Sequence, residues 1–196
     1  MNARVLVNGS DDARVSAFDR GLLYGDGLFE TIRFMRGEAP LWARHMRRLA
    51  DGCARLGMLA PETTRLADEA RRVLAGAGDA VVRITLTRGE GERGYAPPAS
   101  ARTTRIVAAH PVPVIPEHWY RYGIRVRSCG LRLAMQPRLA GLKHLNRLEQ
   151  VLARAEWSDP DVVEGLMFDR DDRLISATAA NVFGVLSGVL VSPALD

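Results

Sequence analysis

The chain has 196 residues, of which 47% are apolar and 26% are charged, a composition typical of a globular protein with one large domain or two small ones. It contains no run of about 18 apolar residues and no leader-like segment at its start, so we predict a cytoplasmic protein with no membrane partner. The net charge of +4 comes from arginines interleaved with 23 acids, which argues against a nucleic-acid partner because nucleic-acid-binding proteins gather their basic residues in one patch.

The first half of the chain predicts a small domain built from strands and two helices. A glycine-rich corner, YGDG at 24–27, separates its first two strands, and RVSAFDRG before this corner is also interpreted as β structure. Alternating and helical spacings of apolar residues define the elements. They are a strand at 4–9, a strand at 28–35, a helix from Leu41 to Gly57, a helix from Pro61 to Leu74, and strands at 80–89 and 101–110.

The segment 111–123 carries three prolines within six positions and predicts an extended linker between two domains. We therefore expect an α+β protein with a small N-terminal α/β domain at 1–110 and a second domain from 124 to 196. The second domain has about half the elements of a closed core, so we expect it to be truncated. Its predicted elements are a strand at 124–129, a helix directly after Lys143, and strands at 164–169, 174–186 and 188–196.

Lys143 is the only lysine among 27 basic residues. A mutational bias toward arginine codons explains the arginines, because the two residues are nearly interchangeable on a solvated surface. They are not interchangeable where the chemistry needs an amine that can lose its proton and form an imine. Lys143 is therefore a candidate reactive amine, and its accidental retention is the alternative.

Several motifs together resemble the fold-type IV pyridoxal-phosphate enzymes, a family that includes aminodeoxychorismate lyases and branched-chain and D-amino-acid aminotransferases. They are YGDGLFETIRF at 24–34, HMRRL at 45–49, LAGLKHLNRLEQVLAR at 139–154, EGLMFD at 164–169 and SATAANVF at 176–183. The stretch around Lys143 is most similar to the lyases. The resemblance implies a two-domain fold with pyridoxal 5'-phosphate as cofactor, held mainly by the larger C-terminal domain, which is incomplete in this chain.

The resemblance implies that Lys143 is the Schiff-base lysine, and the helix predicted after it offers a rigid base through an apolar stripe. It also implies that Arg48, in the H-x-x-R-L motif, binds the cofactor phosphate, for which a bidentate guanidinium is well suited. A solvated helix face is the alternative for Arg48. No metal-ligand set is predicted, and Cys53 and Cys129 are too few for a disulfide framework.

The stretch SATAAN departs from the family pattern. The family carries a glutamate, paired with the pyridine nitrogen, five positions before an asparagine, and counting back from Asn181 gives Ser176. A serine hydroxyl can only hydrogen-bond the ring, so the electron sink is weaker and elimination is favoured over aminotransfer. Thr178 and Ala179 follow as candidates that approach the phosphate. Glu164 is a candidate replacement for the glutamate, although a half-buried structural carboxylate is the favoured interpretation.

The resemblance suggests four further site residues. Thr31 is expected to face the active site, unless it only fills a strand. Arg93, Tyr95 and Arg88 surround the loop RGEGERGY and are candidates to bind substrate carboxylates, because flexible glycine-rich loops often carry binding residues.

We therefore expect a pyridoxal-phosphate lyase that converts 4-amino-4-deoxychorismate to 4-aminobenzoate and pyruvate in folate biosynthesis, and that forms a homodimer as its relatives do. A fold-type IV aminotransferase for D- or branched-chain amino acids is the alternative activity. A non-catalytic, truncated remnant is the alternative from another functional class.

Overall fold

The computed structural model describes residues 4–194, which form two compact units. The first unit comprises the chain up to Pro113 together with Leu142–Leu145, and the second comprises Val114–Gly141 and the chain from Asn146 onward. The division at Pro113 lies inside the segment predicted as a linker. The return of Leu142–Leu145 to the first unit was not expected from the sequence, and it places Lys143 there.

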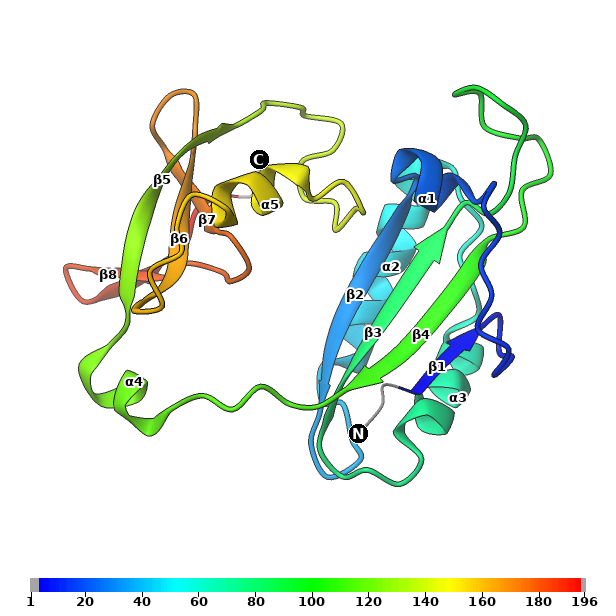
Figure 1. The fold of residues 1–196 in the computed structure, drawn as a ribbon, viewed down its shortest axis with the longest axis horizontal. Helices are drawn as coiled ribbons and strands as arrows, with labels where there is room; N and C mark the ends of the chain where they lie inside the picture. Colours follow the sequence, from blue (N-terminus) through cyan, green and yellow to red (C-terminus); the bar gives the residue numbers. More distant parts are fainter. Residues whose placement is uncertain (1–3, 195–196) are drawn as a thin grey trace. The chain divides into compact units, whose positions relative to one another are not determined.

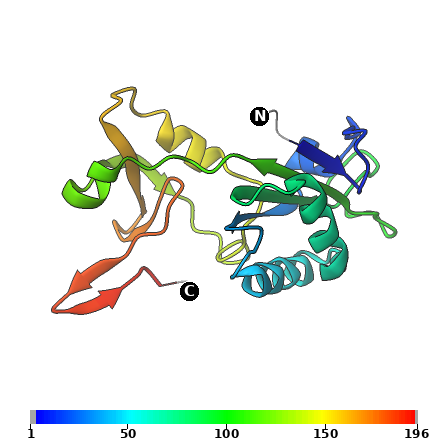
Figure 2. The same ribbon diagram turned by 90° about the horizontal axis from the view of Figure 1, so that it is seen from below.

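The first unit is a four-stranded antiparallel sheet covered on one face by two helices (Figures 1 and 2). The strand order is β1-β4-β3-β2, so β1 and β2 are the edge strands. The strands are β1 (Arg4–Val7), β2 (Gly27–Phe34), β3 (Ala80–Thr87) and β4 (Thr104–His110), and the helices are α2 (Trp42–Leu56) and α3 (Thr63–Leu74).

Alternation along the strands explains how this sheet packs. Side chains of successive residues point to opposite faces, and on β3 the residues Val82, Ile84 and Leu86 are fully buried under the helices while those between them are partly exposed. The helices contribute Met46, Leu49, Cys53, Leu66, Ala70 and Val73 to the same core. The sheet therefore has one face packed under helices, and the other face carries Thr31 and Arg83.

Two predictions about the first unit are wrong in detail. The segment RVSAFDRG at 14–21 forms no strand: it is irregular up to Phe18, and its last two residues begin a short helix, α1 (Arg20–Tyr24). The Asp19 carboxylate caps this helix by accepting a hydrogen bond from the Gly21 amide at 2.8 Å. Pro61 lies just outside α3, which begins at Thr63 after the extended residue Glu62.

The second unit contains a three-stranded sheet of order β5-β6-β7, in which β5 and β6 are parallel and β7 is antiparallel to β6. Its buried cluster is small and consists of Cys129, Ala153, Trp157 and Met167. The elements are α4 (Glu117–Tyr122), β5 (Arg125–Leu133), α5 (Leu148–Arg154), β6 (Val162–Asp169), β7 (Leu174–Ala177) and the hairpin of β8 (Gly184–Leu186) with β9 (Val189–Val191).

Three predictions for this unit are also wrong in detail. The segment 111–123 is not extended throughout, because α4 begins directly after Pro116. A proline is tolerated at the start of a helix, where its missing N–H group is not needed for a helical hydrogen bond. The strand predicted at 174–186 is divided into β7 and β8 by the turn that follows Ala177. The helix expected directly after Lys143 begins only at Leu148.

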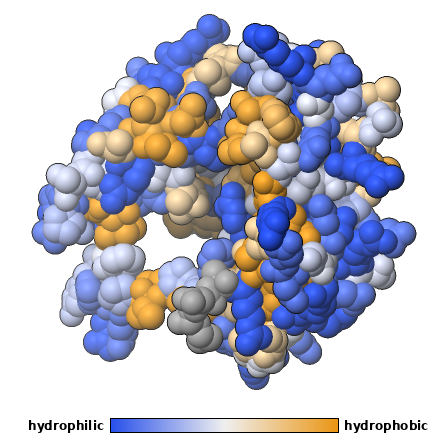
Figure 3. Space-filling model, turned by 45° about the vertical axis from the view of Figure 1, so that its right-hand side comes forward, coloured by the Kyte–Doolittle hydropathy of each residue, from blue (hydrophilic) through white to orange (hydrophobic). Residues whose placement is uncertain are grey.

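The expected apolar stripe of α5 does not anchor Lys143. Leu148, Val151 and Leu152 are 74%, 58% and 59% exposed, and the helix buries Ala153 instead. Apolar side chains, drawn in orange, reach the molecular surface in several places (Figure 3). Lys143 must therefore be held by other contacts.

Candidate active site

Lys143 is held by the free edge of β2. Its carbonyl oxygen accepts a hydrogen bond from the Phe29 amide at 2.9 Å, and the Leu145 amide donates to the Gly27 carbonyl at 3.0 Å. His144 forms an isolated antiparallel bridge with Leu28 between these two bonds. The Lys143 segment thus extends the sheet by one short strand and satisfies main-chain groups that an edge strand otherwise leaves open. Sheet pairing therefore fixes the backbone from which the Lys143 side chain projects.

The Lys143 amine lies against an aromatic ring on the face of the sheet away from the helices. Its Nζ atom is 4.5 Å from the centroid of the Phe29 ring. The Cζ atom of Arg83 lies 4.2 Å from the same centroid. Thr31 pairs with Arg83 across β2 and β3, and its side chain is exposed. Lys143, Phe29, Thr31 and Arg83 therefore form one surface, which we call the amine face.

Glu30 lies on the opposite face of β2 and binds Arg48. The carboxylate of Glu30 is 1% exposed, and it accepts hydrogen bonds from Nε and Nη2 of Arg48 at 2.7 and 2.5 Å. The ring of His45 hydrogen-bonds the same carboxylate at 2.8 Å. The hydrogen bond to Glu30 raises the pKa of the Arg48 guanidinium above its usual value. His45 and Glu30 thus fix the orientation of Arg48.

The donor set of Arg48 fits a phosphate. Its Nη1 atom hydrogen-bonds nothing within residues 4–194, and 48% of its side chain is exposed. A guanidinium has five N–H donors in a planar fork, so a carboxylate on one edge leaves the other edge open to an anion. Arg48 is therefore not simply a solvated residue, because Glu30 binds its Nε and Nη2 atoms, and its Nη1 atom remains available to an anion.

The loop after β3 is anchored by a buried arginine that the sequence analysis did not single out. Arg20, which is 3% exposed, donates hydrogen bonds to the carbonyls of Gly94, Tyr95 and Ala96 and forms an ion pair with Asp26 at 2.9 Å. These bonds fix the backbone around Arg93. The side chain of Arg93 is exposed and has no ion-pair partner in the described part of the chain.

Tyr95 and Arg88 differ in accessibility. Tyr95 is 84% exposed and its ring packs against that of Tyr24. Arg88 is 6% exposed, and its guanidinium donates to Asp26 at 2.7 Å and to the carbonyls of Leu56 and Gly57. Arg88 thus fastens the end of α2 to the sheet, and its donors are used there instead of being open to a substrate carboxylate.

In the second unit, the turn after β7 is organised by Glu164. Its carboxylate accepts hydrogen bonds from the amides of Thr178 and Ala179 at 3.1 and 3.2 Å and from the Thr178 hydroxyl. The amide and hydroxyl donors expected for a phosphate are therefore occupied by Glu164. Ser176 is half-buried on β7 and pairs with Met167.

Two side chains near this turn keep open polar groups. The hydroxyl of Ser176 and the side-chain amide of Asn181 form no hydrogen bond with any residue that the structure describes. Asn181 is exposed. Both groups are therefore able to hydrogen-bond a ligand, whereas Thr178 and Ala179 serve to hold Glu164.

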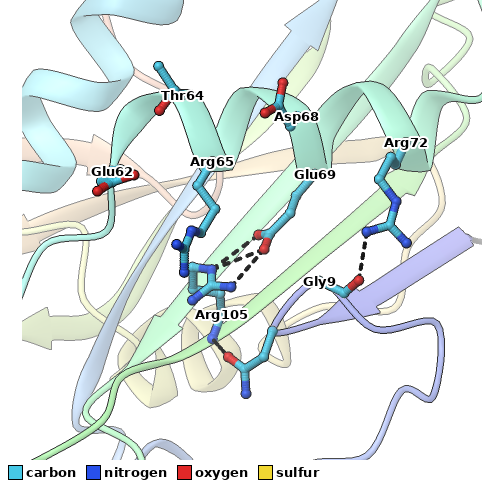
Figure 4. A pocket seen from close by; sticks show the side chains of 9 residues that line it. Gly9, Glu62, Thr64, Arg65, Asp68, Glu69, Arg72 and Arg105 are labelled. Carbon is cyan, nitrogen blue, oxygen red and sulfur yellow. Dashed lines mark hydrogen bonds and ion pairs between the residues drawn. The ribbon is translucent and has the colours of Figure 1, made fainter.

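A shallow depression of about 440 Å³ lies away from these residues, between α3 and the end of β1 (Figure 4). Its charged groups bind one another: Arg105 pairs with the buried Glu69 at 2.8 Å, and Arg72 donates to the Gly9 carbonyl. Because acids and bases neutralise each other there, the depression does not select a charged ligand.

The described residues also contain no cluster of His, Cys, Asp or Glu suited to a metal ion, and no helix among them is long and apolar enough to cross a membrane.

The sequence analysis missed Arg20, Glu30, Phe29 and Arg83. Arg83 could have been found, because it alternates on β3 with the apolar residues Val82 and Ile84 and must therefore point away from the core. No sequence signal identified the carbonyl groups that Arg20 binds, since Gly94 and Tyr95 lie more than seventy residues away along the chain.

Several known proteins are similar to this chain. An aminodeoxychorismate lyase from Vibrio harveyi is 32% identical over 189 residues, which is 96% of this chain and 70% of the relative. The crystal structure of 4-amino-4-deoxychorismate lyase from Pseudomonas aeruginosa is 50% identical with a TM-score of 0.91, and the match covers 97% of this chain and 70% of that one.

A third protein has the same fold at lower identity. A branched-chain amino acid aminotransferase from Escherichia coli is 25% identical with a TM-score of 0.83, and the match covers 97% of this chain and 66% of that one. Another aminotransferase structure of this fold contains pyridoxamine 5'-phosphate. The family model of the class IV aminotransferases matches residues 27–196, most of the chain. The chain therefore belongs to the class IV aminotransferases, the fold-type IV enzymes, and is a homologue of the aminodeoxychorismate lyases.

Proposed function

We propose that the protein is a pyridoxal-phosphate-dependent lyase that converts 4-amino-4-deoxychorismate to 4-aminobenzoate and pyruvate, as a step of folate biosynthesis. The observation that carries the proposal is the position of Lys143. The only lysine of the chain is fixed by sheet pairing at the edge of β2, with its amine against Phe29. The likeness to two aminodeoxychorismate lyases, at 32% and 50% identity, supports this activity over that of the aminotransferases.

The residues of the first unit have chemistry that suits the cofactor. Bound pyridoxal phosphate supplies an electron sink for the carbon from which a proton is removed. We assign to Nη1 of Arg48 a hydrogen bond to the phosphate, because this is the donor that Glu30 leaves open. Nζ of Lys143 would hold the cofactor, and the same amine would take the proton from the substrate ring.

The residues of the second unit favour elimination. The Ser176 hydroxyl, which hydrogen-bonds no residue between 4 and 194, could donate to, or accept from, the pyridine nitrogen, but it carries no charge that would hold a proton there. Aromatisation of the substrate ring helps the lyase reaction, so a weaker electron sink suffices for it. Asn181 is assigned a hydrogen bond to the cofactor, and Thr178 and Ala179 act through Glu164, whose position they fix.

The substrate carries two carboxylates, for which the first unit offers exposed polar groups. We assign Arg93 and Tyr95 to substrate binding, since both are exposed on a loop whose backbone Arg20 holds in place. Thr31 lies on the amine face and is assigned to the reacting end of the substrate. Arg88 is left out of this set, because Asp26 and two carbonyls already bind it.

We further propose that the protein acts in the cytoplasm as a homodimer, with residues 1–110 as the smaller domain and residues 124–196 as part of the larger one. These assignments rest on the family to which the chain belongs.

The test is a comparison of two reactions catalysed by the purified chain with added pyridoxal phosphate. Pyruvate release from 4-amino-4-deoxychorismate is followed with lactate dehydrogenase, and aminotransfer is followed with D-alanine or leucine and 2-oxoglutarate. We expect pyruvate release that Lys143→Arg abolishes, and aminotransfer at least 100-fold slower. If aminotransfer is the faster reaction, the protein is an aminotransferase. If the chain catalyses neither reaction, the result favours a non-catalytic role.

A further inference from the structure

The segment around α1 holds a loop that lies far from it in the sequence. Residues 88–103 connect β3 to β4 and carry the two exposed residues that we assign to substrate binding. The carboxylate of Asp19 closes the base of this loop, because it accepts hydrogen bonds from the hydroxyls of Thr87 and Thr104 at 2.8 and 2.7 Å. Thr87 ends β3 and Thr104 begins β4, so the loop starts and finishes at one buried acid.

Arg20 holds the middle of this loop by its main chain. The guanidinium donates hydrogen bonds to three successive carbonyls, those of Gly94, Tyr95 and Ala96, at 3.0, 3.0 and 3.3 Å. Its Nε atom donates to Asp26 at 2.9 Å. Because a buried charge is costly unless it is hydrogen-bonded, and Arg20 is only 3% exposed, release of these carbonyls is unfavourable.

Tyr24, at the end of α1, adds a second hold on the same three residues. Its hydroxyl accepts a hydrogen bond from the Gly94 amide at 3.3 Å, and the centroid of its ring lies 5.3 Å from that of Tyr95. The Arg20 guanidinium lies over the Tyr24 ring, with its Cζ atom 5.0 Å from the centroid. Arg20 and Tyr24, which we call the clamp, therefore support each other as well as the loop.

The clamp leaves Arg93 open to a ligand. The side chain of Arg93 is exposed, and it forms no ion pair or hydrogen bond with any residue from 4 to 194, although Glu92 precedes it directly. The hydroxyl of Tyr95, which is 84% exposed, is likewise unbonded within these residues. A guanidinium and a phenol hydroxyl are both donors to a carboxylate. The loop therefore combines a held main chain with two open donor groups.

We propose that Arg20 and Tyr24 are positioning residues that hold the 88–103 loop in the conformation in which Arg93 and Tyr95 bind a substrate carboxylate. A loop that is already ordered loses less conformational entropy when a ligand binds, so the clamp raises the affinity without touching the ligand. Neither clamp residue takes part in the chemical step. The identity of the ligand rests on the proposed function, which supplies a substrate with two carboxylates.

The experiment measures how well a carboxylate ligand protects Arg93 from phenylglyoxal, a reagent that modifies exposed arginines, on the full chain. The ligand is chorismate, which carries a hydroxyl where the proposed substrate carries its amine, so it keeps both carboxylates and cannot form an imine. Mass spectrometry of the peptide that contains Arg93 gives the modification rate at each ligand concentration. The concentration that halves this rate measures the affinity, and the rate without ligand shows whether Arg93 stays accessible in each variant.

We expect chorismate to protect Arg93 in the parent protein, with a half-protecting concentration that Arg20→Gln raises about tenfold. Tyr24→Ala keeps the Arg20 side chain and should raise the same concentration by about threefold. Arg88→Gln is the matched control, because Arg88 is similarly buried and shares Asp26 with Arg20, but it binds the end of α2 instead of the loop. It should leave the half-protecting concentration within about twofold of the parent value.

A kinetic measurement separates positioning from a general loss of stability. With 4-amino-4-deoxychorismate as substrate, Arg20→Gln should raise the KM of pyruvate release about tenfold and change kcat by less than about twofold. A residue that only stabilised the fold would instead lower the fraction of active protein, which reduces kcat and leaves KM unchanged.

The inference is overturned by a parent protein in which chorismate does not protect Arg93, or by equal shifts of the half-protecting concentration in Arg20→Gln and Arg88→Gln. An unchanged concentration in Tyr24→Ala also contradicts it, so the test remains decisive where Arg20→Gln does not fold. Protection that depends on the clamp, in a chain without lyase activity, would support the inference while the proposed function fails. Lyase activity without such protection would do the reverse.

Discussion

The two units of the molecule bury very different amounts of apolar surface. In the first unit, four strands and two helices share one core, and Ile32, Val82 and Ile84 have no exposed surface. In the second unit the buried cluster has four residues, and most apolar side chains of α5 and the β8–β9 hairpin are exposed. The sheet of the first unit is thus the more rigid support for a chemical group.

For Lys143, which we propose as the reactive amine, this difference has a consequence. Its sequence neighbours on both sides belong to the second unit, yet Leu142–Leu145 pair with the edge of β2. A reactive group has to be held within a fraction of an ångström to act efficiently, and a strand of a packed sheet gives that precision better than a loop. The well-packed unit therefore supplies the position of the amine.

The largest expected effect on the free energy of unfolding comes from replacing one buried side chain in each core by alanine. Ile84→Ala removes a fully buried side chain from the first core, and we expect a loss of about 3–4 kcal/mol in the free energy of unfolding. Met167→Ala removes an equally buried side chain from the second cluster, which can collapse around the gap, so we expect about 2 kcal/mol. Urea unfolding measures both changes. An equal or larger loss for Met167→Ala would show that the second unit is packed as tightly as the first.

The next largest effect is expected at Asp26 in the first unit, which forms ion pairs with Arg20 and Arg88. Burial raises the pKa of Asp26, but hydrogen bonds from Arg88 and Arg20 outweigh it and hold that pKa below its usual value. A lowered folded-state pKa means that Asp26 stabilises the fold above the unfolded-state pKa of about 3.9, and that this contribution is lost as the pH falls through the folded-state value.

Asp26→Asn should therefore cost about 1–3 kcal/mol at pH 7, where it leaves two buried arginines without their carboxylate. At a pH below the folded-state pKa, the parent and the variant should have nearly the same stability. Urea unfolding at several pH values measures this. A difference that persists undiminished in acid would mean that Asp26 acts by packing instead of by charge.

The smallest effect lies in the second unit. Glu164→Gln keeps the size of the side chain but replaces one acceptor oxygen with a donor that faces the amides of Thr178 and Ala179. We expect about 1 kcal/mol and faster hydrogen exchange at these two amides, with no change in the strands of the first unit. If protection in β2 and β3 also falls, the two units are coupled more strongly than their separate cores imply.

Much of the first unit could be predicted from local patterns. The alternation of β2 and β3 and the apolar spacing of α2 and α3 are strong signals, and the expected strands and helices were found with boundaries shifted by a few residues. The short helix α1 was missed because its cap, Asp19, stabilises five residues that carry no helical apolar pattern. The exposure of Leu148, Val151 and Leu152 could not be foreseen, since an apolar spacing does not say what a helix packs against.

Prediction of the site was limited by contacts that are distant in sequence. Lys143 stood out by its chemistry alone, but its support on Phe29 depends on pairing between segments more than a hundred residues apart. Arg88 was a reasonable candidate next to a glycine-rich loop, and only the carbonyls of Leu56 and Gly57 reveal its structural use. For Glu164, the half-buried structural carboxylate that the sequence favoured agrees with its contacts to Thr178 and Ala179.

The most direct test of Lys143 as the reactive amine is the trapping of pyridoxal phosphate on the chain. One equivalent of cofactor is added at pH 7, the mixture is reduced with borohydride, and mass spectrometry locates the adduct, in the folded chain and in urea. We predict a visible absorbance band before reduction and an adduct on Lys143 that forms much faster in the folded chain than in urea, and that Lys143→Arg lacks. An adduct only at the N-terminal amine, or equal labelling of Lys143 in the folded and unfolded chain, would contradict the account.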